Sequence, residues 1–426
     1  MKNFLIFLLL LFFSCKSPND SAKPKVKEPQ KQEFRFRALN KPTPFVRSIN
    51  SFGLNLYKSL AASDTGNLVL SPLSAYSLLA IYTLGAAGQT REELAHAIQC
   101  GINPDLLLDS LSRILATHKN DSVGEYFSDF VSATAVWKNK GISLTKSFEK
   151  TAKQNDIELK KIDFDDKKDA ERAIDNWASE HTKGKIPDIV DPSDLKGSPI
   201  LFAITNAVSA EAEWAVKFEK GKTAPRDFIL ANGTVTQALT MQKSESESPY
   251  WSYGDFDNFS AIAMRATDSR LTVHVFLPDS GLPIQQFESF LNSNNWEQWQ
   301  DSILPRKQEM KVFLPKFSFK ENIDLIPAVK SFGVGLAFGG GDFSNILSSL
   351  HPIEPFITIL KHSAVITLEE DGFEAHAVSL GIAASKMYRG EPILFNANHP
   401  FFFTITHNET GLILFCGRVM QPVLED

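Results

Sequence analysis

Side chains that can perform hydrolysis are plentiful in this chain, which has 9 histidines and 50 aspartates and glutamates besides many serines. Their spacing matches no hydrolase signature, because neither a Gly-x-Ser-x-Gly elbow nor a His-Glu-x-x-His zinc motif occurs. Phe338 stands where a dinucleotide motif beginning at Gly333-Val-Gly335 needs its third glycine. Gly339-Gly340-Gly341 is interpreted as a turn. The sequence therefore predicts no enzyme, no cofactor and no metal site.

The segment 372–392 has the most unusual composition in the chain. It is rich in glycine, alanine and serine, and it contains the basic stretch Lys386-Met387-Tyr388-Arg389-Gly390. A loop of about twenty residues without structure of its own usually serves a function or is disordered. Its first half nevertheless alternates as a strand does, with one face made of Phe373, Ala375, Ala377 and Ser379 and the other of Glu374, His376 and Val378. The pattern predicts a loop that can also become a strand.

The elements that must position this loop mix helices and strands without regular alternation. Helical spacing of apolar residues predicts helices over 50–60, 74–84, 92–99 and 169–181, and Thr90-Arg91-Glu92-Glu93 is interpreted as a helix start with a capping box. Strands are expected over 132–137, 200–208, 271–277, 311–314 and 364–368, and 401–406 with 412–419 form a predicted hairpin. Helices dominate the first half and strands the second, so the predicted class is α+β.

The N-terminus has the features of an export signal. Lys2 precedes an apolar run over 4–13 that is too short to anchor the chain across a bilayer. The run ends at Ser14-Cys15, which resembles a bacterial lipobox, so we expect a signal peptide over 1–14 and acylation of Cys15. A plain secretory signal with an incidental cysteine is the alternative. Residues 15–40 are expected to form a lipidated, solvated tether, and 41–426 a single domain.

The net charge and the cysteine content bear on nucleic-acid binding and on disulfide formation. The formal net charge is -6, which provides no basic field to attract nucleic acid. Cys100 and Cys416 lie in apolar contexts far apart in the sequence, and two cysteines make no disulfide framework. They are expected to be free buried thiols, with a single disulfide as the alternative.

Several blocks of the sequence, in order, resemble the serpin family of protease inhibitors. They are Asn67-x-x-x-Ser71-Pro72-x-Ser74, Gly85-Ala-x-Gly88-x-Thr90, Thr182-x-Gly-Lys-Ile186, Asn206 with Trp214 and Phe218, Asp342-Phe-Ser344, His362, Glu369-Glu-Asp-Gly372, and the C-terminal runs 395–401 and 414–419. The resemblance covers nearly everything from about Pro44 to Pro422. It implies a fold of three β-sheets with eight or nine helices and an exposed reactive loop.

The resemblance also assigns roles to particular residues. The loop of the family joins the main sheet as a new strand after cleavage, a form of strand addition. It implies a hinge made of Glu370, Gly372, Phe373, Glu374, Ala375 and Ala377. It also implies a hydrogen-bonded cluster beneath the sheet, called the shutter, made of Ser71, Ser74, Asn206 and His362.

The family spacing, counted from Gly372 and from Phe395, places the bond to be cleaved at Lys386–Met387, with Arg389 as the fallback. A lysine there fits the acidic specificity pocket of a trypsin-like serine protease. A cysteine protease with the same preference for lysine is the alternative target. The implied protein is a monomeric suicide substrate that contacts a membrane only through its acyl chains, on the periplasmic or the outer side of a bacterial outer membrane.

Two positions depart from the family pattern in the hinge. Phe373 stands where threonine or serine is usual, and His376 interrupts the alanine run. A ring that must enter a tight slot during insertion costs roughly 1–3 kcal/mol through overpacking. If insertion is slowed, the chain becomes a mere protease substrate or a non-inhibitory binding or carrier module. These readings stay open beside inhibition, whereas a surface hydrolase or adhesin lacks any catalytic constellation.

Overall fold

The computed structural model describes residues 41–119, 128–196, 199–246, 248–267, 269–348, 355–373 and 391–424. All of them belong to one compact unit that begins at Arg37. Within these ranges the chain forms three β-sheets and nine α-helices, which confirms the α+β prediction. The helices are α1 (Pro44–Ala61), α2 (Pro72–Gly85), α3 (Gly88–Ala97), α4 (Leu107–Lys119), α5 (Lys146–Gln154), α6 (Lys167–His181), α7 (Ile284–Ser289), α8 (Ser293–Ser302) and α9 (Ile326–Ser331).

The six-stranded sheet, called the main sheet below, has the strand order β12-β13-β14-β4-β2-β3. Its strands are β2 (Ser128–Asn139), β3 (Ile157–Ile162), β4 (Phe202–Glu213), β12 (Phe317–Asp324), β13 (Lys361–Glu369) and β14 (Gly372–Phe373). Among the described strands, β13 and β4 are joined only through the two residues of β14. Below β14 a seam therefore runs between β4 and β13.

A seven-stranded sheet and a four-stranded sheet complete the β structure. The larger has the order β1-β17-β16-β9-β8-β7-β10 and the smaller β15-β11-β6-β5. Their strands are β1 (Leu68–Leu70), β5 (Ala224–Ile229), β6 (Val235–Glu245), β7 (Trp251–Phe256), β8 (Phe259–Arg265), β9 (Leu271–Pro278), β10 (Leu304–Pro305), β11 (Met310–Pro315), β15 (Ile393–Asn396), β16 (Phe401–His407) and β17 (Leu412–Val419).

The expected hairpin near the C-terminus is confirmed, since β16 and β17 pair antiparallel across a polar turn. The thiols are free as expected: Cys416 is buried in β17, while Cys100 is partly exposed. Because they lie among the described residues and form no bond, the disulfide alternative is wrong for this structure. Burial raises the pKa of Cys100, so its thiol stays protonated at neutral pH.

The helices near the main sheet begin where the local sequence supplies a cap. Ser71 caps α2, its hydroxyl accepting from the Ser74 N–H at 3.3 Å, and Pro72 occupies a first-turn position where no N–H is needed. The predicted capping box at Thr90 is wrong, because α3 already begins at Gly88. The Thr90 hydroxyl instead accepts from the backbone N–H of Asp342 at 3.0 Å, a partner that is remote in sequence.

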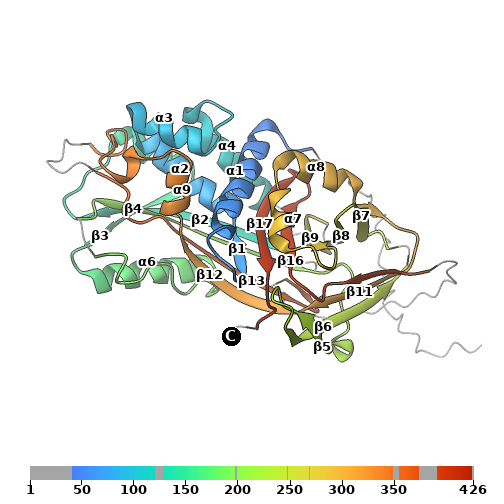
Figure 1. Ribbon diagram of the computed structural model, residues 1–426. Coiled ribbons are helices and arrows are strands. Elements are labelled where there is room, and N and C mark those ends of the chain that lie inside the picture. Colours follow the sequence, from blue (N-terminus) through green and yellow to red (C-terminus); the bar gives the residue numbers. More distant parts are fainter. Residues whose placement is uncertain are drawn as a thin grey trace, which may run out of the picture. The chain divides into compact units, whose positions relative to one another are not determined.

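The main sheet lies between α6 on one side and α2 on the other (Figure 1). Nearly every residue of α2 is buried, so this helix lies inside the larger core. On the opposite face, the side chains of Trp137, Trp177 and Ile186 form a smaller core beneath α6 and the segment that follows it. Both faces of the seam are therefore covered.

Candidate functional site

The hinge turns sharply back into the main sheet. From the end of β13 the chain passes through Glu370 and Asp371 into β14, which pairs antiparallel with β13 and with β4 at once. Gly372 lies opposite Glu213 and Phe373 lies opposite Ala212. A Cβ on Gly372 would be 2.1 Å from the Ala212 carbonyl oxygen, so only glycine fits this close approach of backbones.

Phe373 is already inside the sheet. Its side chain is 0% exposed and packs edge-on against Trp214, with 5.7 Å between the ring centroids. The sequence predicted that this ring must overcome a packing cost when the loop enters. The ring fits here because the cross-strand neighbour on β4 is the small Ala212. The inward orientation of Phe373 is as expected. However, this residue is already part of the main sheet in the intact chain, before any cleavage.

The backbone of the hinge turn is held by the chain segment that follows β4. The Trp214 indole N–H donates to the Glu369 carbonyl at 2.8 Å, and its backbone N–H donates to the Asp371 carbonyl at 3.0 Å. The Phe218 N–H donates to the Glu370 carbonyl at 3.0 Å. These three bonds fix the backbone of the hinge turn at Glu369, Glu370 and Asp371.

The acidic side chains of the turn are paired with lysines and a threonine. Glu370 is buried, receives a hydrogen bond from the Thr223 hydroxyl at 2.6 Å and pairs with the Lys316 ammonium at 2.8 Å. Burial opposes ionisation, but these two partners outweigh it and hold the pKa of Glu370 below its usual value. Asp371 pairs with the exposed Lys220 at 2.6 Å. Glu370 was expected from the sequence, whereas its partners were missed because nothing local links them to the hinge.

Three of the four expected shutter residues are connected. The Ser71 backbone N–H donates to His362 Nε2 at 3.0 Å, and the Ser71 hydroxyl accepts from Ser74 N–H. Asn206 is not bonded to them. Its amide nitrogen donates to the Ala133 carbonyl at 3.1 Å and to the Thr134 hydroxyl at 2.8 Å, both on β2. The seam thus separates Asn206 on β4 from His362 on β13.

Three polar atoms of the shutter residues lack a hydrogen-bond partner among the described residues. They are Asn206 Oδ1, His362 Nδ1 and Ser74 Oγ, on side chains that are 4%, 1% and 1% exposed. Burial lowers the pKa of His362 to about 4, so the ring is neutral at pH 7. Because a backbone N–H can only donate, Nε2 is the acceptor and the ring hydrogen resides on Nδ1. The shutter therefore offers an unused amide oxygen that can accept, an unused ring N–H that can donate, and an unused hydroxyl.

The segment that follows α6 crosses the seam and is tied to strands on both sides of it. Lys185 pairs with Glu211 on β4, Asp188 pairs with Lys320 on β12, and Asp194 pairs with Lys361 on β13 at 3.0 Å. The apolar side chains of this segment, Ile186, Ile189 and Val190, pack on the same face of the sheet. A strand entering the seam has to pass beneath this cover.

The remaining predicted residues lie outside the described ranges. These are Glu374, Ala375, Ala377, Lys386, Met387 and Cys15. The part of the chain that the structure describes contains no group of three or more histidine, cysteine or acidic side chains arranged to hold a metal ion. Within the same ranges, no helix is long and apolar enough to cross a membrane.

Comparison with known proteins gives a consistent result. The family model for the serpins, described as serine protease inhibitors, matches residues 47–422. An uncharacterised serpin-like protein of Thermococcus kodakarensis is 33% identical over 386 residues, covering 89% of this chain and 86% of that protein. The leukocyte elastase inhibitor of Xenopus laevis is 30% identical, covering 87% of this chain and 97% of that protein.

Solved structures share the fold. The thermophilic serpin tengpin in its native state superposes with a TM-score of 0.79 at 23% identity, covering 90% of this chain and 95% of that one.

Proposed function

This chain belongs to the serpin family, and from that membership we propose that it traps a trypsin-like serine protease as a suicide substrate. The protease serine attacks the Lys386 carbonyl, the bond to Met387 breaks, and the new amino terminus at Met387 takes up a proton. Lys386 is then held to the protease as an acyl ester. Insertion of residues 374–385 into the seam of the main sheet drags the protease away before water hydrolyses the ester.

One observation carries this proposal. The first two residues of the loop already form β14 in the seam, antiparallel to both β13 and β4. Among the described residues, β4 and β13 are not paired with each other beyond β14, and a strand added at this seam would gain backbone hydrogen bonds there. The alternation of small residues after Phe373 suits a strand whose inner face meets a packed core. The intact chain is thus proposed to be held above a more stable inserted state.

The residue proposed to precede the cleaved bond, called the bait below, determines the class of target protease. Lys386 favours enzymes that cleave after lysine, and a cysteine protease with that preference remains the second candidate target. Arg389 is the alternative bait if the cleaved bond lies three residues further on. We propose further that the protein is monomeric and attached by acylated Cys15 to a bacterial outer membrane, facing the periplasm or the exterior.

The test is incubation of residues 33–426 with trypsin, followed by a denaturing gel and mass spectrometry. The expected result is a denaturant-stable complex together with a released peptide that begins at Met387. Lys386→Ala is the matched variant, and it should form no complex. Arg389→Ala should leave complex formation unchanged, unless Arg389 is the bait.

The runner-up function gives a different outcome in the same experiment. A non-inhibitory serpin or a mere substrate would be cleaved after Lys386 without forming a complex. The departure at Phe373 motivated this alternative, but its ring lies in the sheet of the intact chain. Absence of cleavage anywhere in 380–392 would contradict the assignment of the loop itself.

A further inference from the structure

A cavity of about 410 Å³ lies where the four-stranded and the seven-stranded sheets meet. Three connections form its walls: the turn between β5 and β6, the connection from β9 to α7, and the residues that lead into β16. None of its lining residues belongs to the main sheet or to the hinge. Its volume falls in the range of small-molecule binding sites.

Hydrogen bonds tie the three walls of this cavity to one another. The Ile229 N–H donates to the Asn398 carbonyl at 2.8 Å, which joins the end of β5 to the segment before β16. His399 Nε2 lies 2.8 Å from the Pro278 carbonyl oxygen, which joins that segment to the end of β9. The cavity is therefore formed before any ligand arrives, and binding does not have to order its walls.

The cavity has an apolar floor and a polar rim. Ile284 is 3% exposed and Pro400 is buried, whereas Ser280 and Gln285 are exposed. A ligand can therefore bury an apolar body against the floor and keep a polar end near the water. The apolar side chains that line the cavity are those of Ile229, Leu230, Leu282, Pro283, Ile284 and Pro400.

The charge of the lining restricts the ligand. Among the described residues that line the cavity there is no aspartate, glutamate, lysine or arginine. An ionised ligand would lose part of its hydration there without gaining an opposite charge. The His399 ring is already engaged, because Nδ1 lies 3.0 Å from Asn398 Oδ1 and Nε2 contacts the Pro278 carbonyl. The cavity therefore favours a neutral molecule.

The Asn398 side chain supplies a hydrogen-bond donor beside the apolar floor. Its Oδ1 faces His399 Nδ1, and its backbone N–H donates to the Asn396 carbonyl at 2.9 Å. Its Nδ2 donates to none of the described residues, although the side chain lines the cavity. An amide nitrogen of this kind carries two hydrogens, so it can donate to an acceptor on a ligand.

We propose that this cavity binds a neutral, largely apolar small molecule that carries a carbonyl group. The apolar body packs against Ile284 and Pro400, and the carbonyl oxygen accepts from Asn398 Nδ2. This site goes beyond the proposed function, because binding requires neither loop cleavage nor loop insertion. Each of the two proposals can therefore fail without the other.

The test uses three probes of similar shape: 2-acetylnaphthalene, which is a neutral ketone, 2-naphthoate, which is its anionic counterpart, and naphthalene, which has no acceptor. Equilibrium dialysis measures their binding to residues 33–426, which include the whole compact unit. The ketone should bind once per chain with a Kd near or below about 100 µM. The anion should bind at least about tenfold more weakly. Equal binding of the anion and the ketone, or no binding of the ketone at 1 mM, would overturn the proposal.

A variant that fills the cavity locates the bound probe. Ser280→Trp places a large ring at an exposed lining position, so it should abolish ketone binding while leaving the thermal midpoint unchanged. Ser302→Trp is the matched control, because Ser302 is equally exposed on α8 and does not line the cavity. Undiminished binding in Ser280→Trp would show that the ketone binds elsewhere.

A second variant tests the hydrogen bond from Asn398. Asn398→Asp keeps an oxygen beside His399 and replaces the amide donor by an acceptor. The affinity for 2-acetylnaphthalene should fall about tenfold, whereas the affinity for naphthalene should not change. An equal change for both probes would show that the amide does not recognise the carbonyl group, and that part of the proposal would be wrong.

Discussion

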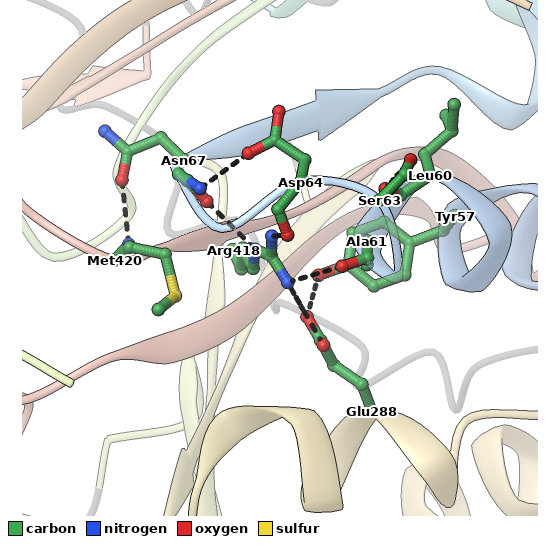
Figure 2. Close-up of polar contacts among 10 residues, drawn as sticks. Tyr57, Leu60, Ala61, Ser63, Asp64, Asn67, Glu288, Arg418 and Met420 are labelled. Carbon is green, nitrogen blue, oxygen red and sulfur yellow. Dashed lines mark hydrogen bonds and ion pairs between the residues drawn. The ribbon is translucent and has the colours of Figure 1, made fainter. Parts of the chain in front are cut away.

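Two buried polar clusters of this molecule differ in how completely their hydrogen bonds are satisfied. At the end of β17, the fully buried Arg418 guanidinium pairs with both carboxylate oxygens of Glu288 at 3.1 and 3.2 Å and donates to the Gly66 carbonyl at 2.9 Å (Figure 2). The Tyr57 hydroxyl donates to Glu288 at 2.6 Å. The shutter, by contrast, leaves Asn206 Oδ1, His362 Nδ1 and Ser74 Oγ without partners among the described residues.

The difference follows from where the clusters lie. Arg418 lies on β17, and its network reaches Tyr57 on α1 and Glu288 on α7, all of them away from the seam of the main sheet. A charged network whose hydrogen bonds are all satisfied makes one arrangement of these elements much more stable than any other. Asn206 and His362 lie on the two strands that β14 separates. In the proposed mechanism a new strand enters between them, and hydrogen bonds that joined the two strands directly would oppose this entry.

The largest expected effect breaks the satisfied cluster. Arg418→Ala leaves the Glu288 carboxylate buried without its cation, and we expect the free energy of unfolding to fall by about 3–5 kcal/mol. Equilibrium unfolding in guanidinium chloride measures it, on the intact and on the cleaved form alike. The double variant Arg418→Met with Glu288→Leu removes both charges and should recover most of the loss. A single-variant loss below about 1 kcal/mol would contradict the comparison.

The next effect concerns the unsatisfied cluster and appears as a pH dependence. His362 has a pKa of about 4 in the folded chain, against about 6.5 when unfolded. Between these values the unfolded chain binds a proton that the folded chain does not, so stability falls as the pH falls from about 6.5 to 4. The full difference amounts to roughly 3 kcal/mol.

His362→Gln tests this prediction and should flatten the unfolding free energy between pH 6.5 and 4. His274 is the control, because burial first and Arg265 second lower its pKa to about 3 in the seven-stranded sheet. His274→Gln should also reduce the fall in unfolding free energy at low pH. Its effect should be the same in the cleaved and in the intact form. An unchanged slope in His362→Gln would show that the imidazole is not buried and neutral.

Much of this arrangement could be predicted from the sequence where the signal is local. Helical spacing predicted a helix over 74–84, and α2 covers this range, although it begins at Pro72 with Ser71 as its cap. Alternation along the loop placed Phe373 on the inward face, where the structure has it. In contrast, the burial of Phe373 in the sheet depends on the small Ala212, which lies opposite it on β4. This pairing joins residues far apart in the sequence, so the sequence alone did not predict it.

Non-local pairing also explains what the sequence missed. The Thr90 block has the composition of a capping box, but the hydroxyl serves a backbone N–H at Asp342 instead. The acidic run before Gly372 is evident in the sequence, but its partners are not. Only the fold shows that Lys316 and Thr223 contact Glu370. The sequence predicts residue types at a site more readily than it predicts their pairing.

The smallest expected effect lies at the hinge, which is satisfied like the Arg418 cluster but less deeply buried. Glu370→Gln removes the charge that Lys316 faces at 2.8 Å, and we expect the intact form to lose roughly 1–2 kcal/mol. The pKa of Glu370 is below its usual value, so its contribution is present above about pH 4.5 and is lost as the pH falls through the folded pKa. The loss in the variant should therefore be visible at pH 7 and disappear once the pH has fallen below the folded pKa of Glu370, a window that begins below that of His362.

Asp371→Asn provides the matched control for this last variant. Its partner Lys220 has a side chain that is 70% exposed, so solvent screens the pair and the expected change is smaller than that for Glu370. If both variants lost the same stability, burial would not be what separates the two carboxylates. If Glu370→Gln also destabilised the cleaved form equally, the hinge turn would be as permanent as the Arg418 cluster and not part of the movable seam.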